Sequence, residues 1–207
     1  DLTSGVCQVY ATGYAFAALK EDGSVVTWGD DDFGGDSSYV DLSSGVSQIY
    51  STFYAFAALK EDGSVETWGW DVYGGDSSDV DLSSGVSQIY STFNAFAALK
   101  EDGSVVTWGY DDRGGDSSDV DLDSGVSQIY SNVGAFAAIK DDGSVVTWGH
   151  HSNGGDSSDV DLDSDVSQIY SNIGAFAAIK DDGSVVTWGY EGYGGDSSDV
   201  DLDSDVS

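Results

Sequence analysis

A repeat of 40 residues is the feature that most restricts how this chain can fold. The stretch AFAALKEDGSVETWG, residues 55–69, recurs with few changes in every unit. Its counterparts are residues 15–29, 95–109, 135–149 and 175–189. The units run 1–40, 41–80, 81–120, 121–160 and 161–200, and residues 201–207 begin a further copy. A fixed period of this kind is typical of a propeller, a solenoid or a stacked array. Composition does not change along the chain, so we treat residues 1–207 as one repeat domain.

Each unit predicts a β-hairpin. Two short runs, residues 55–59 and 65–68, flank a turn that contains Asp62 and Gly63. An Asp-Gly pair favours a tight hairpin because glycine accepts positive φ, and both runs are too short for an ordinary helix. With a preceding strand at 46–51 and a looser segment after the hairpin, a unit holds three or four strands, the size of one propeller blade.

Two positions in the repeat carry further information. A tryptophan ends every hairpin, and we expect it to pack against the adjoining unit, because an indole buries a large apolar area. The five are Trp28, Trp68, Trp108, Trp148 and Trp188. Elsewhere, the glycine at Gly5, Gly45, Gly85 and Gly125 becomes Asp165 and Asp205. If the glycine has positive φ, aspartate is among the few residues that tolerate the same backbone.

The hairpin also resembles a known repeat. The run LKEDGSVETWG at residues 59–69, followed by Gly74, resembles the repeat of the RCC1 (regulator of chromosome condensation) family, Leu-x-x-(Asp)-Gly-x-Val-(Tyr)-x-Trp-Gly-x-(Asn)-x-x-Gly-Gln-Leu-Gly. The likeness covers all five units and implies a β-propeller of four-stranded blades. Three departures leave blade number and ring closure open: Ala55 replaces the family's histidine, Gly75-Asp76-Ser77 replaces its Gln-Leu-Gly, and the units are shorter and fewer than in the founding members. Guanine-nucleotide exchange and nucleosome binding do not carry over, since no exchange element is present.

The fold class that follows is an all-β repeat protein, a β-propeller with five 40-residue blades of three or four antiparallel strands. The alternative is an open β-solenoid or stacked array. We favour the closed ring because closure removes exposed strand edges. Residues 201–207 repeat the role of residues 1–7, however, and both cannot fill one slot of a five-bladed ring.

Charge restricts the partners. Thirty-eight acidic residues against six basic ones give a net charge of −32. Nucleic acid and anionic lipid are therefore poor partners, because both require a basic surface. No apolar run has the length of a membrane span. The single cysteine, Cys7, leaves no disulfide within the chain. We expect an extracellular or cell-surface protein, and the chain, which begins with Asp1, fits a mature or excised portion of something longer.

The units differ mainly in two stretches, and these are the candidate binding loops. One comprises residues 30–33, 70–73, 110–113, 150–153 and 190–193; the other comprises 12–14, 52–54, 92–94, 132–134 and 172–174. The first is rich in residue types common at interface hot spots. Its candidates are Asp31, Phe33, Trp70, Tyr73, Tyr110, Arg113, His150, His151, Tyr190 and Tyr193. We expect the loops to form one contact rim; unconstrained variation in loops is the alternative.

Calcium is the one cofactor that the sequence suggests. Carboxylates spaced along the unit junctions are hard oxygen ligands of the kind that Ca²⁺ prefers, although no complete EF-hand loop is present. The candidate ligands are Asp156, Asp159, Asp161, Asp163, Asp196, Asp199, Asp201 and Asp203. The simpler interpretation is a solvated acidic edge that discourages aggregation between strands.

No set of catalytic residues stands out. The only histidines are the adjacent His150 and His151, no single carboxylate pair stands apart as an acid–base couple, and no phosphate-binding motif is present. We therefore expect no enzyme activity. The sequence favours a non-enzymatic extracellular module that binds a protein or glycan ligand. The alternative is a structural segment of a long surface fibre that self-associates end to end.

Overall fold

The computed structural model describes residues 2–200, and every regular element in that range is a β-strand or a three-residue 3₁₀ helix. Each unit forms one three-stranded antiparallel sheet, with its strands in chain order. The strands are β1 (Val6–Ala11), β2 (Ala15–Lys20), β3 (Val25–Gly29), β4 (Val46–Ser51), β5 (Ala55–Lys60), β6 (Val65–Gly69), β7 (Val86–Ser91), β8 (Ala95–Lys100), β9 (Val105–Gly109), β10 (Val126–Ser131), β11 (Ala135–Lys140), β12 (Val145–Gly149), β13 (Val166–Ser171), β14 (Ala175–Lys180) and β15 (Val185–Gly189). The 3₁₀ helices are η1 (Asp31–Phe33), η2 (Asp71–Tyr73), η3 (Asp111–Arg113), η4 (His151–Asn153) and η5 (Glu191–Tyr193). The predicted all-β repeat is confirmed.

The predicted hairpin is present in each unit. In the second unit, β5 pairs with β6, and the amide of Lys60 donates to the carbonyl of Ser64 at 2.8 Å. Gly63 has φ of +78°, and a Cβ there would lie 2.9 Å from the backbone nitrogen of Gly85 in the next unit. Glycine is therefore required both by the turn and by the close approach of the next unit's backbone.

The looser fourth segment does not become a strand in the described residues. After β6 the chain forms η2 and then turns. It meets the sheet again where the Thr67 hydroxyl donates to the carbonyl of Gly75 at 3.0 Å and where the amide of Val65 donates to the carbonyl of Leu82 at 3.0 Å. Each blade therefore has three strands. Leu82, which is 5% exposed, anchors this segment in the core.

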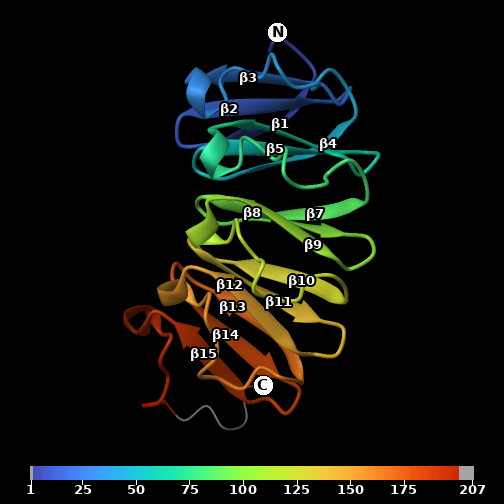
Figure 1. The fold of residues 1–207 in the computed structure, drawn as a ribbon. Coiled ribbons are helices and arrows are strands. Elements are labelled where there is room, and N and C mark those ends of the chain that lie inside the picture. Colours follow the sequence, from blue (N-terminus) through green and yellow to red (C-terminus); the bar gives the residue numbers. More distant parts are fainter. Residues whose placement is uncertain (1, 201–207) are drawn as a thin grey trace.

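The sheets stack face to face, and the core lies between them (Figure 1). Because successive side chains of a strand point to opposite faces, β5 presents Ala55, Ala57 and Leu59 to one neighbour and Phe56 and Ala58 to the other. The cluster between the second and third units combines that first set with Leu82, Val86, Ile89, Phe96, Ala98 and Trp108. Both faces of a middle sheet are thus buried, and the same type of cluster recurs at each of the four junctions.

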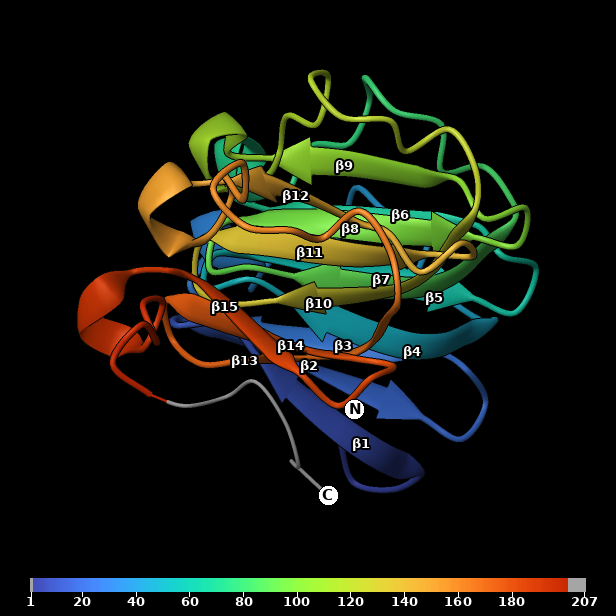
Figure 2. The ribbon, with the colours of Figure 1, turned by 90° about the horizontal axis from the view of Figure 1, so that it is seen from below.

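The stack is open. The sheets advance along one direction, so the first and fifth units lie at opposite ends (Figure 1), although they overlap when viewed along the stack (Figure 2). Phe16 and Trp28 of the first unit are 44% and 36% exposed, whereas Phe56 and Trp68 are fully buried. The closed ring that we favoured is therefore not formed by residues 2–200, because no sheet among them covers the outer face of the first unit. Residues 201–207, which raised the question of closure, lie outside the described residues.

A hydrogen bond from each inner tryptophan fixes it to the unit before. Trp108 donates its Nε1–H to the carbonyl of Gly74 at 3.2 Å. Trp68, Trp148 and Trp188 repeat the bond to Gly34, Gly114 and Gly154. Gly74 has φ of +104°, and a Cβ there would lie 2.6 Å from the Phe96 ring. The buried indole and the glycine whose carbonyl accepts its hydrogen bond therefore form one contact between units. The sequence predicted this packing of the tryptophan against the adjoining unit.

The glycine that becomes aspartate also behaves as expected. Gly45, Gly85 and Gly125 have φ between +74° and +76°. Asp165 has φ of +65° and is the one residue other than glycine with positive φ among those described. A Cβ at Gly45 or Gly85 would meet nothing within 4 Å, so only the backbone conformation opposes a side chain there. Aspartate thus replaces glycine without changing the path of the chain.

The tryptophan contact predicts a difference between end and middle units. Trp108→Ala removes a buried ring and leaves the Gly74 carbonyl without its donor, so we expect the free energy of unfolding to fall by about 3–5 kcal/mol. The matched variant Trp28→Ala removes a half-exposed ring whose indole bonds to no other described unit, and it should cost about 1 kcal/mol. Urea unfolding followed by circular dichroism measures both. Equal losses would contradict the assigned role of the contact.

Candidate interaction surface

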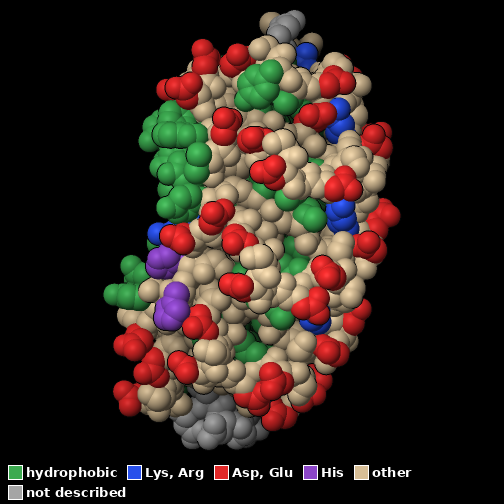
Figure 3. Space-filling view, viewed as in Figure 1, with side chains coloured by type: hydrophobic (Ala, Val, Ile, Leu, Met, Phe, Trp, Pro, Cys, Tyr) green, Lys and Arg blue, Asp and Glu red, His purple; other side chains and the backbone are tan. Residues whose placement is uncertain are grey.

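Both variable stretches of a unit lie at the same end of its sheet. β4 ends at Ser51, β5 begins at Ala55 and β6 ends at Gly69, so an antiparallel arrangement brings residues 52–54 beside residues 70–73. Stacking of the units then aligns these loops along one edge of the molecule. Figure 2 shows the short helical turns together on one side, and Figure 3 shows hydrophobic side chains gathered along the same edge in the first units, followed by both histidines.

The first three units form what we call the aromatic strip, a chain of rings in contact. It comprises Tyr14, Phe33, Phe53, Tyr54, Trp70, Tyr73, Phe93 and Tyr110. Tyr54 is central, with its ring centroid 4.6 Å from that of Tyr73 and 5.8 Å from that of Trp70. Phe33 lies 5.0 Å from Trp70. Trp70 is 43% exposed, so the strip is a surface and not a second core.

Sequence reasoning selected four members of the strip and left out the other four. Phe33, Trp70, Tyr73 and Tyr110 belong to the first variable stretch, whereas Tyr14, Phe53, Tyr54 and Phe93 belong to the second. The signal for the second group was present, because its three-residue loop differs between units. What the sequence did not show is that the two loops touch, which follows from the pairing of β5 with β6.

Hydrogen bonds to the backbone fix the loops that carry the strip. The amide of Phe53 donates to the carbonyl of Phe93 at 3.0 Å, one unit further along. Buried Thr52 joins the two loops of its own unit, because its hydroxyl accepts from the amide of Ala55 at 2.9 Å and donates to the carbonyl of Tyr73 at 3.2 Å. Asn132 does the same in the fourth unit. Loops tied in this way lose little conformational freedom when they bind a partner.

From Arg113 in the third unit through the fourth unit the edge is polar. Arg113 donates to the Oδ1 of Asn153 at 3.1 Å, which joins the loops of neighbouring units. His151 lies 3.4 Å from a carboxylate oxygen of Asp156, and the Nδ1 of His150 is buried without a hydrogen-bond partner. Of the remaining candidates, Asp31 is exposed on η1, and Tyr190 and Tyr193 form a separate ring pair with centroids 5.0 Å apart.

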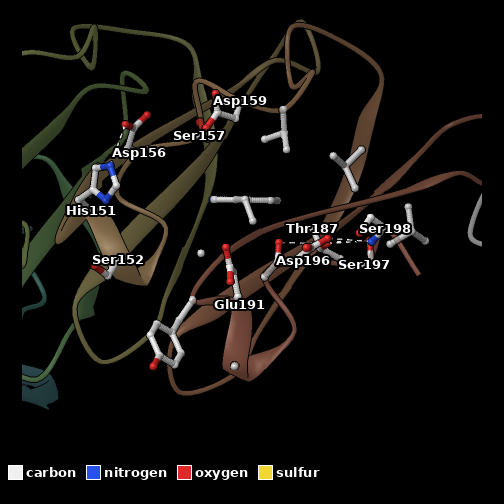
Figure 4. Close-up of a pocket in the computed structure, with 18 residues that line it drawn as sticks. His151, Ser152, Asp156, Ser157, Asp159, Thr187, Glu191, Asp196, Ser197 and Ser198 are labelled. Carbon is white, nitrogen blue, oxygen red and sulfur yellow. Dashed lines mark hydrogen bonds and ion pairs between the residues drawn. The ribbon is translucent and has the colours of Figure 1, made fainter. Parts of the chain in front are cut away.

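A groove lies at each junction between units, beside the edge just described. Its cavity volume is 580 Å³ between units 1 and 2, 490 Å³ between units 2 and 3, 270 Å³ between units 3 and 4, and 810 Å³ between units 4 and 5. Figure 4 shows the widest, in which Asp156 faces His151, and Glu191 lies in the middle of the groove. On the far side Thr187 donates to the Ser197 hydroxyl at 2.8 Å, so this serine belongs to the loop structure.

The serines of the groove are not paired with a histidine in the described residues. Ser157 accepts a hydrogen bond from Thr147 at 2.9 Å, and within residues 2–200 no hydrogen bond joins a serine to His150 or His151. A nucleophile needs a base within hydrogen-bond reach. The expectation of a non-enzymatic protein stays a prediction.

Three of the aspartates proposed for calcium accept hydrogen bonds from backbone amides within their own loops. Asp156 accepts from the amide of Ser158 at 2.9 Å, and this bond lowers the pKa of its carboxyl. Asp161 accepts from the amide of Asp163 and pairs with Lys180 at 3.2 Å, and both contacts lower its pKa. Asp196 accepts from the amide of Ser198 at 2.9 Å. Asp159, Asp163 and Asp199 are exposed, and Asp201 and Asp203 lie outside the described residues. In the described part of the chain no three acidic, histidine or cysteine side chains group together as a metal site would.

Calcium binding stays a prediction with a direct measurement. If the junction aspartates hold Ca²⁺, millimolar CaCl₂ should raise the melting temperature above the value found in NaCl of equal ionic strength, because a ligand that binds only the folded state stabilises it. Salt also stabilises this chain by screening, because a net charge of −32 repels itself. That contribution is the same in both solutions because their ionic strength is equal. Identical melting temperatures would reject the site.

Comparison with known proteins identifies the fold. No family model matches the sequence, and no curated protein matches it. Yeast RCC1 (Prp20), solved bound to Kap60, superimposes with a TM-score of 0.55 at 19% identity, over 89% of this chain and 56% of that one. The CRINKLY WD40 ectodomain of the Arabidopsis thaliana receptor kinase ACR4 gives 0.57 at 16% identity, over 89% and 68%. Human WBSCR16 gives 0.53 at 19% identity, over 89% and 61%.

These similarities show an RCC1-like arrangement of blades. The chain spans little more than half the length of the RCC1 structure and about three fifths of WBSCR16. The resemblance of the repeat to the RCC1 pattern is therefore supported at the level of fold. No helix within residues 2–200 has the length and apolar character needed to cross a membrane.

Proposed function

We propose that this chain is a non-enzymatic, extracellular interaction scaffold whose aromatic strip binds a protein ligand. The observation that carries the proposal is the strip itself, with Trp70 and Tyr14 respectively 43% and 49% exposed in one contiguous group. Large exposed apolar patches mark interaction sites on soluble proteins, and tryptophan and tyrosine are enriched among hot-spot residues. A glycan, which can stack on the same rings, is the alternative ligand.

The acidity of the chain defines the kind of protein that it binds. Asp31, Asp32 and Asp71 lie on the 3₁₀ helices beside the strip and are exposed. With a net charge of −32, the molecule attracts basic partners and repels acidic ones before contact. We therefore expect a ligand that combines basic and apolar residues, and we expect no binding to nucleic acid.

A displayed peptide library selected on the intact chain tests this function. We expect the selected peptides to be rich in basic and aromatic residues, and the double variant Tyr54→Ser, Trp70→Ser to weaken their Kd at least tenfold, or about 1.4 kcal/mol. Tyr170→Ser is the matched control, because Tyr170 is 53% exposed on β13, away from the strip. Peptides that bind the double variant as well as the parent chain would overturn the proposal.

A second function, as a segment of a fibre, is favoured by the exposed face of the first unit. Phe16 and Trp28 carry the same face that each later unit packs against its predecessor. At the other end of the stack, Gly194 has φ of +91° and open space around it, while its counterparts accept the tryptophan bond. We propose that the first unit of one copy can dock on the fifth unit of another, in a head-to-tail contact that does not close.

Sedimentation velocity over a concentration series, with negative-stain imaging, tests the fibre function. High salt should promote association, because it screens the charge of −32. We expect linear assemblies from the parent chain and monomers from the double variant Phe16→Ser, Trp28→Ser, while Tyr170→Ser should assemble like the parent. A monomeric parent at every salt and protein concentration would reject this function.

A further inference from the structure

The groove between units 1 and 2 differs from the other grooves because three aromatic side chains, one of them Tyr39, line it beside its carboxylates. Its walls include Phe33, Tyr39 and Trp70 with Asp31, Asp32, Asp36 and Asp71. We infer that this groove binds an organic cation, a guanidinium or a methylated ammonium group, carried by a basic segment of the protein ligand. The inference rests on the proposed function, since it names the chemistry that the ligand presents at one point of the surface.

We call the three aromatic side chains of this groove, Phe33, Tyr39 and Trp70, the cage, because aromatic side chains are what such cations contact at their recognition sites. The centroids of Phe33 and Trp70 are 5.0 Å apart and their planes meet at 58°, so the two rings form a corner. The hydroxyl of Tyr39 accepts from the amide of Gly69 at 3.1 Å, which ties this 62% exposed side chain to the residue before Trp70. A cation over the face of an aromatic ring is attracted by its quadrupole, most strongly for tryptophan.

The charge of the groove is uncompensated. Four carboxylates and no lysine or arginine line it. The backbone N–H of Ser38 donates to Asp36 at 2.9 Å and holds the pKa of that carboxyl below its usual value, so Asp36 stays ionised at neutral pH. An incoming cation therefore gains both the cation–π contact and the attraction of nearby negative charge.

The repeat provides an internal comparison that isolates Tyr39. The later units carry Asp79, Asp119 and Asp159 at its position. The groove between units 2 and 3 is lined by two aromatic side chains, Trp108 and Tyr110, and carries Asp79 where the first groove has Tyr39. Between units 3 and 4 Trp148 alone lines the groove with an aromatic ring. Among the four grooves, only the first has three aromatic walls.

A metal ion is a poorer occupant than an organic cation. Ca²⁺ and Mg²⁺ require oxygen ligands over most of their surface, whereas Phe33 offers none and Trp70 offers only a ring face and an N–H donor. A guanidinium or a methylated ammonium is less strongly hydrated than a metal ion, so it gives up water more easily to contact a ring. The aromatic walls thus select the organic cation.

The test is calorimetric titration of the intact chain with the probe peptide acetyl-Gly-Arg-Gly-amide and with its citrulline counterpart, which has the same shape without the charge. A trimethyl-lysine peptide and CaCl₂ serve as further arms. We expect one site for the arginine or trimethyl-lysine peptide and at least tenfold weaker binding of citrulline. Equal binding of arginine and citrulline, or binding of CaCl₂ that displaces the peptide, would overturn the inference.

Substitutions taken from the repeat itself sharpen the test. Tyr39→Asp inserts the residue that later units carry, so the fold should be kept, and binding should fall at least tenfold even though the groove gains a negative charge. Asp79→Tyr should complete a second cage with Trp108 and Tyr110 and raise the stoichiometry from one to two. Asp119→Tyr, in a groove that Trp148 alone lines with an aromatic ring, should leave it at one. Unchanged binding by Tyr39→Asp would reject the cage.

Failure of the cage can be told apart from failure of the proposed function. If the double variant Tyr54→Ser, Trp70→Ser weakens binding of the library peptides and Tyr39→Asp does not, the strip is the binding surface and the cage is rejected. If neither variant weakens binding of the peptides, both the strip as the binding surface and the cage are rejected. Melting curves followed by circular dichroism on every variant establish that the compared proteins are folded.

Discussion

The contact between a tryptophan and the preceding unit is the interaction on which the rest of the structure depends. A single three-stranded sheet cannot bury both of its faces, so each unit needs neighbours to form a core. Trp108 fills the space beside Phe96 and donates to the Gly74 carbonyl across the junction. Because Gly74 has no side chain, the Phe96 ring can lie against its backbone. Apolar burial and one directional bond together fix how each sheet sits on the last.

That repeated geometry also creates the binding surface. If every sheet is placed on its neighbour in the same way, the loops at one end of each sheet must line up along one edge. Variation within those loops then alters a single surface: aromatic over units 1 to 3, where Tyr54 joins the rings, and polar at Arg113 and His151. A scaffold with a nearly constant core and variable loops is suited to recognition, since its loops change without cost to packing. The end faces are the exception, because there the core contacts themselves are exposed.

Several features were predictable because they depend on residues close together in the chain. The hairpin around Gly63 follows from a turn that needs positive φ, and Asp165 reveals the same backbone need by its identity. The aromatic strip was only partly predictable: Trp70 and Tyr73 stood out by type, but the contact of Tyr54 with both depends on strand pairing. Tyr39 gave a signal, as the one aromatic residue at an aspartate position, yet its role depends on a groove formed by two units.

The sequence by itself determined the repeat, the strands and turns of each unit, the tryptophan packing and the acidic character, because periodicity, glycine positions and charge are local properties of the chain. Only the tertiary structure decided that the stack is open, which rings of the two sets of loops touch, and that Phe33, Tyr39 and Trp70 line one groove. Closure depends on the small rotation and displacement that packing imposes at each junction, summed over all units. No single repeat contains that sum, so it cannot be read from the residues of one unit.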